Sequence, residues 1–494
     1  MRYVHRPASP RLRGTAALAG AVALASLAAL VPGQGEARAA PAVAPAAAGD
    51  YVSRPDITAP DLATEVHGGA MNGLLLTTPA SLLTGASGVA LYDNSGELVW
   101  WLEPEDGRGY FNAEFVIYRG RPAIATFEFP GLDEYGQPLP GDCVLFDISY
   151  NEIARFGMQG YPTDTHEVEF SPDGERVLLL SYQPVTRDLS DYGGPADAVV
   201  IDTIVQEQKI RTGEVTFEWS ALESVPLAET EESLAEPGLT GEFDPYHVNS
   251  LQYDVDGTLL VSARNTSTVY KLDRETGDIV WRFGGENSDF AFEDAADAPS
   301  YQHDARLLPD GTLTLFDNGN TRAPQHSRGA TYALDTGDMT ADLIRDLQPE
   351  EPVYSPFAGS NRAAPNGNQF VSYGATGQLI EFDGARPVLT GEFEGEWVTY
   401  RTERAQWHAV PDAAPDAVVG ERERDGSREV AMSWNGATDV GAWRIRAGGE
   451  YLATVPATGF ETIASVTPPR GATKLQITPL HRDGYPLDTV TVRL

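Results

Sequence analysis

Three histidines occupy the same position in successive copies of a repeated sequence pattern. His166 and His303 each lie eight residues before the glycine of a Pro-Asp-Gly turn, and His247 lies ten residues before an Asp-Gly turn. A neutral imidazole is a good nucleophile near pH 7, and a protonated one is a general acid. Three imidazoles in one pocket could also hold a metal ion such as Zn²⁺. The alternative is that the position only caps a strand in each copy.

Arg264 is a candidate for the same pocket. It follows His247 by 17 residues, on the next strand of the same predicted hairpin. The planar guanidinium offers a fork of donors that suits an oxyanion such as sulfate or phosphate. A salt bridge to one of the many carboxylates is the alternative role. Arg306 and Arg322 are further candidates for this pocket.

The repeats predict the fold that must position these side chains. Units start near residues 60, 110, 166, 247, 303 and 359, and each contains two hairpins with Asp-Gly or Asn-Gly turns. Two hairpins make a four-stranded blade, so we predict an all-β chain with a six-bladed β-propeller over residues 56–407. Equivalent positions in the blades face one axis, which would bring the histidines together. An unclosed β-sandwich is the alternative, but radial closure limits exposed edges.

Two further segments of the predicted domain organisation lack these repeats. Residues 408–494 contain short alternating strands with Gly and Asp turns, which predicts a small immunoglobulin- or fibronectin-like β-sandwich. The acidic stretch 229–242 is predicted to be a solvated loop inserted in the unit that starts at residue 166. The sandwich shows no cluster of titratable residues, so we expect a packing or adhesion role for it.

The N-terminus predicts export. Residues 1–39 combine an Arg-rich start, an Ala-rich apolar run and a small-residue cleavage pattern, and residues 40–55 form an Ala/Pro-rich linker. We therefore expect a cleaved signal peptide and a secreted protein, with an uncleaved anchor as the alternative. The only cysteine, Cys143, has no intramolecular partner and lies in an apolar run, so we expect a buried thiol.

The net charge limits the partners of the chain. It is −37, from 35 Lys and Arg against 72 Asp and Glu. A nucleic-acid binder needs a basic face, and an anionic membrane surface repels an acidic protein. We therefore expect no nucleic-acid partner, and no membrane contact after leader cleavage. The oligomeric state is not predicted.

Five blocks of the sequence form a recognisable set: His247-Val-Asn-Ser250, Ser262-Ala-Arg-Asn265, Gln302-His-Asp-Ala-Arg306, Phe316-Asp-Asn-Gly319 and Ser433-Trp-Asn-Gly-Ala-Thr-Asp439. These blocks resemble the bacterial arylsulfotransferases that work without the nucleotide sulfate donor. The resemblance covers roughly residues 60 to 490, and its tail is similar to the secreted branch of that family.

The resemblance implies a function and a role for each candidate residue. A sulfuryl group would pass from an aryl sulfate ester to a phenolic acceptor through a sulfohistidine, with neither a cofactor nor a metal. His303 matches the nucleophile of the family, His166 and His247 its other pocket histidines, and Arg264 its sulfate-binding arginine. Periplasmic members also carry a disulfide, which this chain cannot form, and pocket tyrosines, for which Tyr110 is a candidate.

Two other functions are compatible with the same residues. One is a three-histidine metal-dependent enzyme. The other is a non-catalytic extracellular propeller that acts as a binding or adhesion module, because propellers host many unrelated functions.

Overall fold

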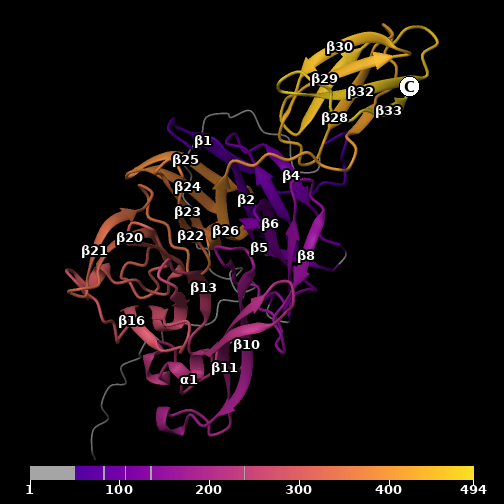
Figure 1. The fold of residues 1–494 in the computed structure, drawn as a ribbon. Helices are drawn as coiled ribbons and strands as arrows, with labels where there is room; N and C mark the ends of the chain where they lie inside the picture. Colours follow the sequence, from indigo (N-terminus) through magenta and orange to yellow (C-terminus); the bar gives the residue numbers. More distant parts are fainter. Residues whose placement is uncertain (1–50, 82–83, 106, 134–135, 239) are drawn as a thin grey trace, which may run out of the picture.

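The computed structural model describes residues 51–494 except 82–83, 106, 134–135 and 239. The predicted leader (1–39) and most of the predicted linker lie outside the described residues. The regular structure is nearly all β-strand, which confirms the all-β prediction (Figure 1). The described segments contain no helix with the length and apolar character needed to cross a membrane. The short helices are α1 (Ala221–Ser224), η2 (Ser190–Tyr192), η3 (Leu227–Glu229), η4 (Arg264–Thr266), η5 (Ala295–Asp297) and η6 (Gly374–Thr376).

Within the described segments, six sheets follow one another between Leu62 and Ala405 and lie around a common centre, as in a β-propeller (Figure 1). The strands of each sheet are given from the centre outwards. The first sheet consists of β26 (Trp397–Ala405), β2 (Leu74–Ser81), β3 (Val89–Tyr92) and β4 (Leu98–Leu102). The second sheet consists of β5 (Gly109–Tyr118), β6 (Arg121–Phe129), β7 (Asp142–Phe146) and β8 (Glu152–Phe156). The next two are β9 (Val168–Phe170), β10 (Arg176–Arg187), β11 (Ala198–Lys209) and β12 (Val215–Ser220), then β13 (Val248–Tyr253), β14 (Leu259–Ala263), β15 (Thr268–Leu272) and β16 (Ile279–Gly284). The last two are β18 (His303–Leu307), β19 (Thr312–Asp317), β20 (Arg328–Asp335), β21 (Thr340–Leu347) and β17 (Ala291–Phe292), then β22 (Ser360–Ala363), β23 (Gln369–Tyr373), β24 (Gln378–Asp383), β25 (Arg386–Phe393) and β1 (Leu62–Val66).

Strands from both ends of this region close the ring. β26 pairs antiparallel with β2, so that Ala405 lies opposite Leu74 and Trp397 opposite Ser81. β1 pairs with β25 in the neighbouring sheet. Two sheets therefore combine N-terminal and C-terminal strands, which holds the ends of the ring together.

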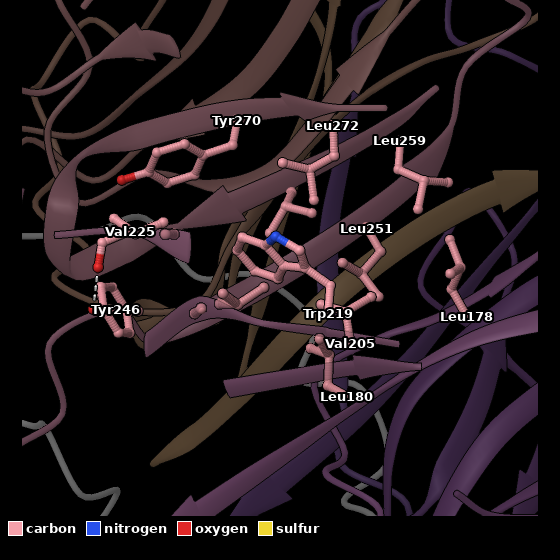
Figure 2. Packing of buried hydrophobic residues seen from close by; sticks show 14 residues of the cluster. Leu178, Leu180, Val205, Trp219, Val225, Tyr246, Leu251, Leu259, Tyr270 and Leu272 are labelled. Atoms are coloured by element: carbon pink, nitrogen blue, oxygen red, sulfur yellow. Dashed lines mark hydrogen bonds between the residues drawn. The ribbon is translucent and has the colours of Figure 1, made fainter. Parts of the chain in front are cut away.

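Apolar clusters fill the junctions between neighbouring sheets. Figure 2 shows one of them, in which Trp219, Leu178 and Val205 of one sheet pack with Leu251 and Leu259 of the next. The other five junctions contain the pairs Leu145 and Val177, Phe283 and Leu315, Phe316 and Val371, Phe370 and Leu75, and Leu76 and Ala113. Because these clusters join each sheet to the next and the last to the first, the ring is closed rather than an open stack.

Residues after β26 form two further sheets that pack face to face. Their strands are β27 (Asp416–Val419), β28 (Arg428–Ser433) and β31 (Glu461–Val466), facing β30 (Glu450–Pro456), β29 (Val440–Ala447), β32 (Lys474–His481) and β33 (Val490–Arg493). Met432, Trp434 and Trp443 lie in the core between the sheets. This is a β-sandwich.

The sandwich contacts the propeller through backbone-directed hydrogen bonds. The Asn435 side chain accepts from Trp101 N at 2.9 Å and donates to Trp101 O at 2.8 Å. The Tyr150 hydroxyl donates to Gly436 O at 2.9 Å. Gly436 has φ 94°, and a Cβ there would lie 2.3 Å from the Tyr150 ring, so this close approach requires glycine.

Candidate active site at the centre of the propeller

The structure brings the three candidate histidines together at one end of the ring. His303 is the first residue of β18, His247 immediately precedes β13, and His166 lies two residues before β9. The ring centroids of His166 and His247 are 5.1 Å apart. The Tyr400 ring lies 5.4 Å from His166 and 6.4 Å from His303. One small molecule could therefore touch all three imidazoles.

Irregular backbone at the start of the inner strands gives these side chains their direction. The register shifts between Val248 and Ser250 in β13 and between His303 and Arg306 in β18. His247 and Asp304 have φ values of 48° and 54°. Bulges of this kind turn a side chain away from the regular alternation of a strand, and they recur next to active sites.

The fourth repeat places Gly359 where the other copies have histidine. Its φ is 110°, and a Cβ there would lie 2.4 Å from the Phe316 ring. The packing between these two sheets therefore excludes a side chain at this position, which limits the histidine set to three neighbouring repeats.

Aromatic rings line the histidine cluster. Phe111 stacks on Tyr400 at 4.6 Å, and Tyr182 lies 5.5 Å from both His166 and His247. The hydroxyls of Tyr182 and Tyr400 donate to the backbone oxygens of β13, so their rings face the site. Such walls suit an aromatic substrate.

The tyrosine candidate from the sequence was wrong. The side chain of Tyr110 packs in the apolar junction with Leu76 and Ile124. Its neighbour Phe111 faces the histidines instead, because successive side chains of a strand point to opposite faces. Tyr182 and Tyr400 were not identified from the sequence.

His303 is held in one tautomer. Its Nδ1 lies 2.7 Å from Asn318 Oδ1, while Asn318 Nδ2 donates to Ser355 O and Ala358 O at 2.8 and 3.0 Å. Those two carbonyls fix the amide orientation, so the His303 Nδ1 carries the proton and Nε2 the lone pair. Burial holds the pKa of His303 well below its usual range, and the positive charge of Arg264 is the second largest cause of this shift. The ring is therefore a neutral imidazole with a free electron pair.

The other two histidines each contact a carboxylate. His166 Nδ1 lies 2.7 Å from Asp164 Oδ1, and His247 Nδ1 lies 2.7 Å from Asp244 Oδ2. The pKa of each aspartate is lowered despite burial, because a histidine charge and its hydrogen bonds favour the carboxylate. A carboxylate on Nδ1 stabilises the imidazolium that forms when Nε2 takes a proton. Burial nevertheless lowers the pKa of His247, and Asp244 opposes that shift. The carboxylate at Nδ1 distinguishes these two histidines from His303, whose Nδ1 faces a neutral amide oxygen.

Arg264 lies in η4, in the turn that follows β14. Its Nη1 donates to Asn265 Oδ1 at 2.7 Å and its Nη2 to Pro356 O at 3.3 Å, both neutral oxygens. Its guanidinium lies 4.6 Å from the centre of the Tyr301 ring. Burial lowers its pKa, and its charge in turn acts on His247 and His303. The arginine is therefore close to the histidines, and within the described part of the chain its hydrogen-bond partners are neutral oxygens rather than a carboxylate.

The two further arginine candidates were wrong. Arg306 Nη2 pairs with Glu167 at 2.7 Å, and Arg322 pairs with Asp317 and donates to Ala298 O. Both guanidinium groups thus hold other parts of the fold. The sequence alone could not exclude Arg306, because the bulge in β18 decides which side chains of that strand face the histidines.

A buried ionic network lies beside the site along the inner strands. We call it the hub network; its members are Glu114, Glu167, Asp304, Arg306, Arg362, Arg401 and Glu403. Three of them, Glu167, Asp304 and Arg401, are the chain neighbours of His166, His303 and Tyr400. Arg401 also donates to Asn249 O at 2.6 Å. The network therefore ties the inner strands together at the level where they carry the site.

Across the segments that the structure describes, no three His, Cys, Asp or Glu side chains form a group that could hold a metal ion. The Nδ1 atoms of all three histidines are hydrogen-bonded, which leaves Nε2 of each ring as the nitrogen available for chemistry.

Comparison with known proteins assigns the chain to a family. The fold and site define a β-propeller with a buried histidine and arginine centre. The sequence profile of the arylsulfotransferase (ASST) family matches residues 120–393, more than half of the chain. The chain therefore belongs to the arylsulfotransferase family, which confirms the resemblance seen in its motifs.

Other comparisons give only distant similarity. No curated protein matches the chain. Among solved structures, it is similar to a protein of unknown function from Bacteroides caccae, with 14% identity over 67% of this chain and 98% of that chain and a TM-score of 0.41. It is also similar to a streptogramin B lyase, with 9% identity over 75% and 94% of the two chains and a TM-score of 0.33. The β-propeller domain of Myceliophteria thermophila Cps50 (Swd1) shows 11% identity over 62% and 95%, with a TM-score of 0.33.

Proposed function

We propose that this protein moves a sulfuryl group from an aryl sulfate ester to a phenol through a sulfohistidine on His303, without a nucleotide sulfate donor. The observation that carries the proposal is the neutral His303, whose Nδ1 proton is held by Asn318 and whose Nε2 keeps its lone pair. A nucleophile needs that free pair, and a protonated imidazole lacks it.

The reaction has two balanced steps. In the first, His303 Nε2 attacks the sulfur, an N–S bond forms, the S–O bond to the aryl ring breaks, and a phenolate leaves. A protonated His166 or His247 gives the phenolate its proton. In the second, the hydroxyl oxygen of the acceptor attacks sulfur, the N–S bond breaks, and the acceptor proton returns to that imidazole. General acid help of this kind contributes about 10²–10⁴-fold.

Arg264 and the aromatic walls position the donor. Sulfuryl transfer resembles phosphoryl transfer in having a loose transition state, in which positioning and charge stabilisation dominate. The unused donors of Arg264 would bind the sulfate oxygens, and Tyr400 and Phe111 would face the aryl ring. Replacement of Arg264 by alanine should weaken transfer and leave the fold intact, as thermal unfolding would check.

The test is incubation of the purified protein with a chromogenic aryl sulfate, with and without a phenol. We expect acceptor-dependent release of the chromophore and its loss in His303→Ala. His326→Ala is the matched control, because His326 is half-buried and its Nδ1 hydrogen-bonds to Pro324 O rather than to a residue of the site. Equal activity of the His303 variant and wild type would reject His303 as the nucleophile.

We also propose that the enzyme is exported and acts outside the cell, as in the secreted branch of the family. The support is the Arg-rich start, apolar run and small-residue cleavage pattern of residues 1–39. Expression of the full chain should give mature protein in the medium that begins near Ala40. Mass measurement of an intact N-terminus on membrane-bound protein would contradict cleavage.

A further inference from the structure

The start of the acidic insertion 229–242 is linked to the active-site arginine, whereas residues 235–238 are exposed, as predicted for a solvated loop. Glu229 is buried and accepts hydrogen bonds from Tyr270 and Arg282 at 2.9 and 3.2 Å. Glu231 N donates to Asn265 O at 2.8 Å. Asn265 in turn accepts from Arg264 Nη1. One short chain of hydrogen bonds therefore joins this segment to Arg264.

Glu232 is a residue of this segment whose carboxyl interacts electrostatically with Arg264. Its carboxyl oxygen Oε1 is buried and, among the described residues, has no hydrogen-bond partner. Its carboxyl also interacts with the Tyr301 hydroxyl. Because the Tyr301 ring lies 4.6 Å from the Arg264 guanidinium, Glu232 and Arg264 flank the same ring.

The groups that face Glu232 come from three elements. They are Arg264 in η4, Tyr301 in the segment before β18, Glu231 in the insertion itself and Asp244 two residues after it. Burial raises the pKa of Glu232, and the positive charge of Arg264 opposes that shift. Glu232 is also the carboxylate with the largest effect on the charge of Arg264.

We propose that Glu232 is a specificity-determining residue that opposes anion binding at Arg264, so that the site takes a sulfate ester most tightly when Glu232 is neutral. The inference rests on the proposed function because it takes Arg264 as the sulfate-binding group. A sulfate ester brings a negative charge to a guanidinium that Glu232 already shields. Donor binding is therefore coupled to uptake of a proton.

The size of the effect follows from Coulomb's law. A unit charge about 10 Å from the bound anion, at an effective dielectric constant of about 20, changes the dissociation constant roughly tenfold. We therefore expect Glu232→Gln to bind sulfate about tenfold more tightly than wild type at about pH 8. The difference should shrink as the pH falls and the wild-type carboxyl takes up its proton.

The experiment is a titration of the full-length mature protein with inorganic sulfate, in which calorimetry measures the dissociation constant at several pH values. Glu236→Gln is the matched control, because Glu236 is exposed in the same segment. The Glu232→Gln variant should gain affinity and lose most of the pH dependence, the Glu236→Gln variant should match wild type, and Arg264→Ala should abolish binding in either background.

Two results would overturn the inference: unchanged or weaker sulfate binding in Glu232→Gln, or a wild-type affinity that does not vary with pH. Because sulfate binding needs no turnover, its outcome is separate from that of the proposed function. A protein that gains affinity in Glu232→Gln but transfers no sulfuryl group would keep this inference and refute the enzymatic proposal.

Discussion

Replacement of Asn318 by alanine tests how the nucleophile is prepared. The change removes the acceptor for His303 Nδ1 and two hydrogen bonds to Ser355 O and Ala358 O. Asn318 is fully buried, and each buried hydrogen bond contributes about 1 kcal/mol, so we expect the free energy of unfolding to fall by about 3 kcal/mol. Without the acceptor, His303 also samples the tautomer that protonates Nε2.

The expected catalytic loss is about 10- to 100-fold in the rate of the first step, which corresponds to about 1.4–2.7 kcal/mol of activation free energy. The assay is stopped-flow release of the phenol from a chromogenic aryl sulfate in the absence of acceptor. Asn361→Ala is the matched control: Asn361 is also fully buried and donates to Leu315 O and Ala330 O, but it does not contact His303. It should lose stability and keep its rate. A folded Asn318→Ala variant with a rate within about twofold of wild type would refute the reasoning.

Three more predictions concern protons. Because burial keeps the pKa of His303 well below its usual range, the rate of the first step should persist at about pH 5.5, where an ordinary histidine is mostly charged. A rate of phenol release, measured by stopped flow, that falls to half near about pH 6.5 would contradict this. Asp164→Asn and Asp244→Asn should separate the roles of His166 and His247. In a series of aryl sulfates, the variant that weakens the general acid should slow the release of poor phenolate leaving groups more than that of good ones. Equal slowing across the series in both variants would exclude both histidines as the general acid. Burial and repulsion by Glu167 raise the pKa of Glu114 from 4.5 to about 7, so the folded state keeps this proton to higher pH than the unfolded chain and wild-type stability falls as pH rises from about 4.5 to about 7. Glu114→Gln lacks that fall, and denaturant unfolding should show its stability relative to wild type rising by about 3 kcal/mol between about pH 5 and pH 8.5; a constant difference would contradict it.

The repeats made much of the fold predictable. The spacing from each histidine to its turn glycine is a local property, and it predicted that His166, His247 and His303 would lie at equivalent places in neighbouring sheets. The repeated hairpins with their Asp-Gly and Asn-Gly turns predicted an all-β chain. Ring closure by β26 and β2 joins residues more than 300 positions apart, and no local pattern encodes that pairing.

The partners of the histidines were less predictable, because they also come from distant parts of the sequence. Tyr400 reaches the site from the closing strand, and Asn318 reaches it from the end of β19. Their roles depend on closure and on the bulges of the inner strands, which alternation does not reveal. The burial of Glu229 at the start of the acidic insertion was not predicted, because its charge indicates solvent, whereas Tyr270 and Arg282 supply buried partners for it.

The central claim is that His303 carries the sulfuryl group between the two substrates. The most direct measurement is mass spectrometry of the enzyme after brief incubation with an aryl sulfate in the absence of acceptor, with digestion at alkaline pH. The account predicts one added SO₃ group on the peptide that contains His303, its disappearance on addition of a phenol, and its absence in His303→Ala. Transfer without an adduct, or an adduct on His166 or His247 instead, would contradict it.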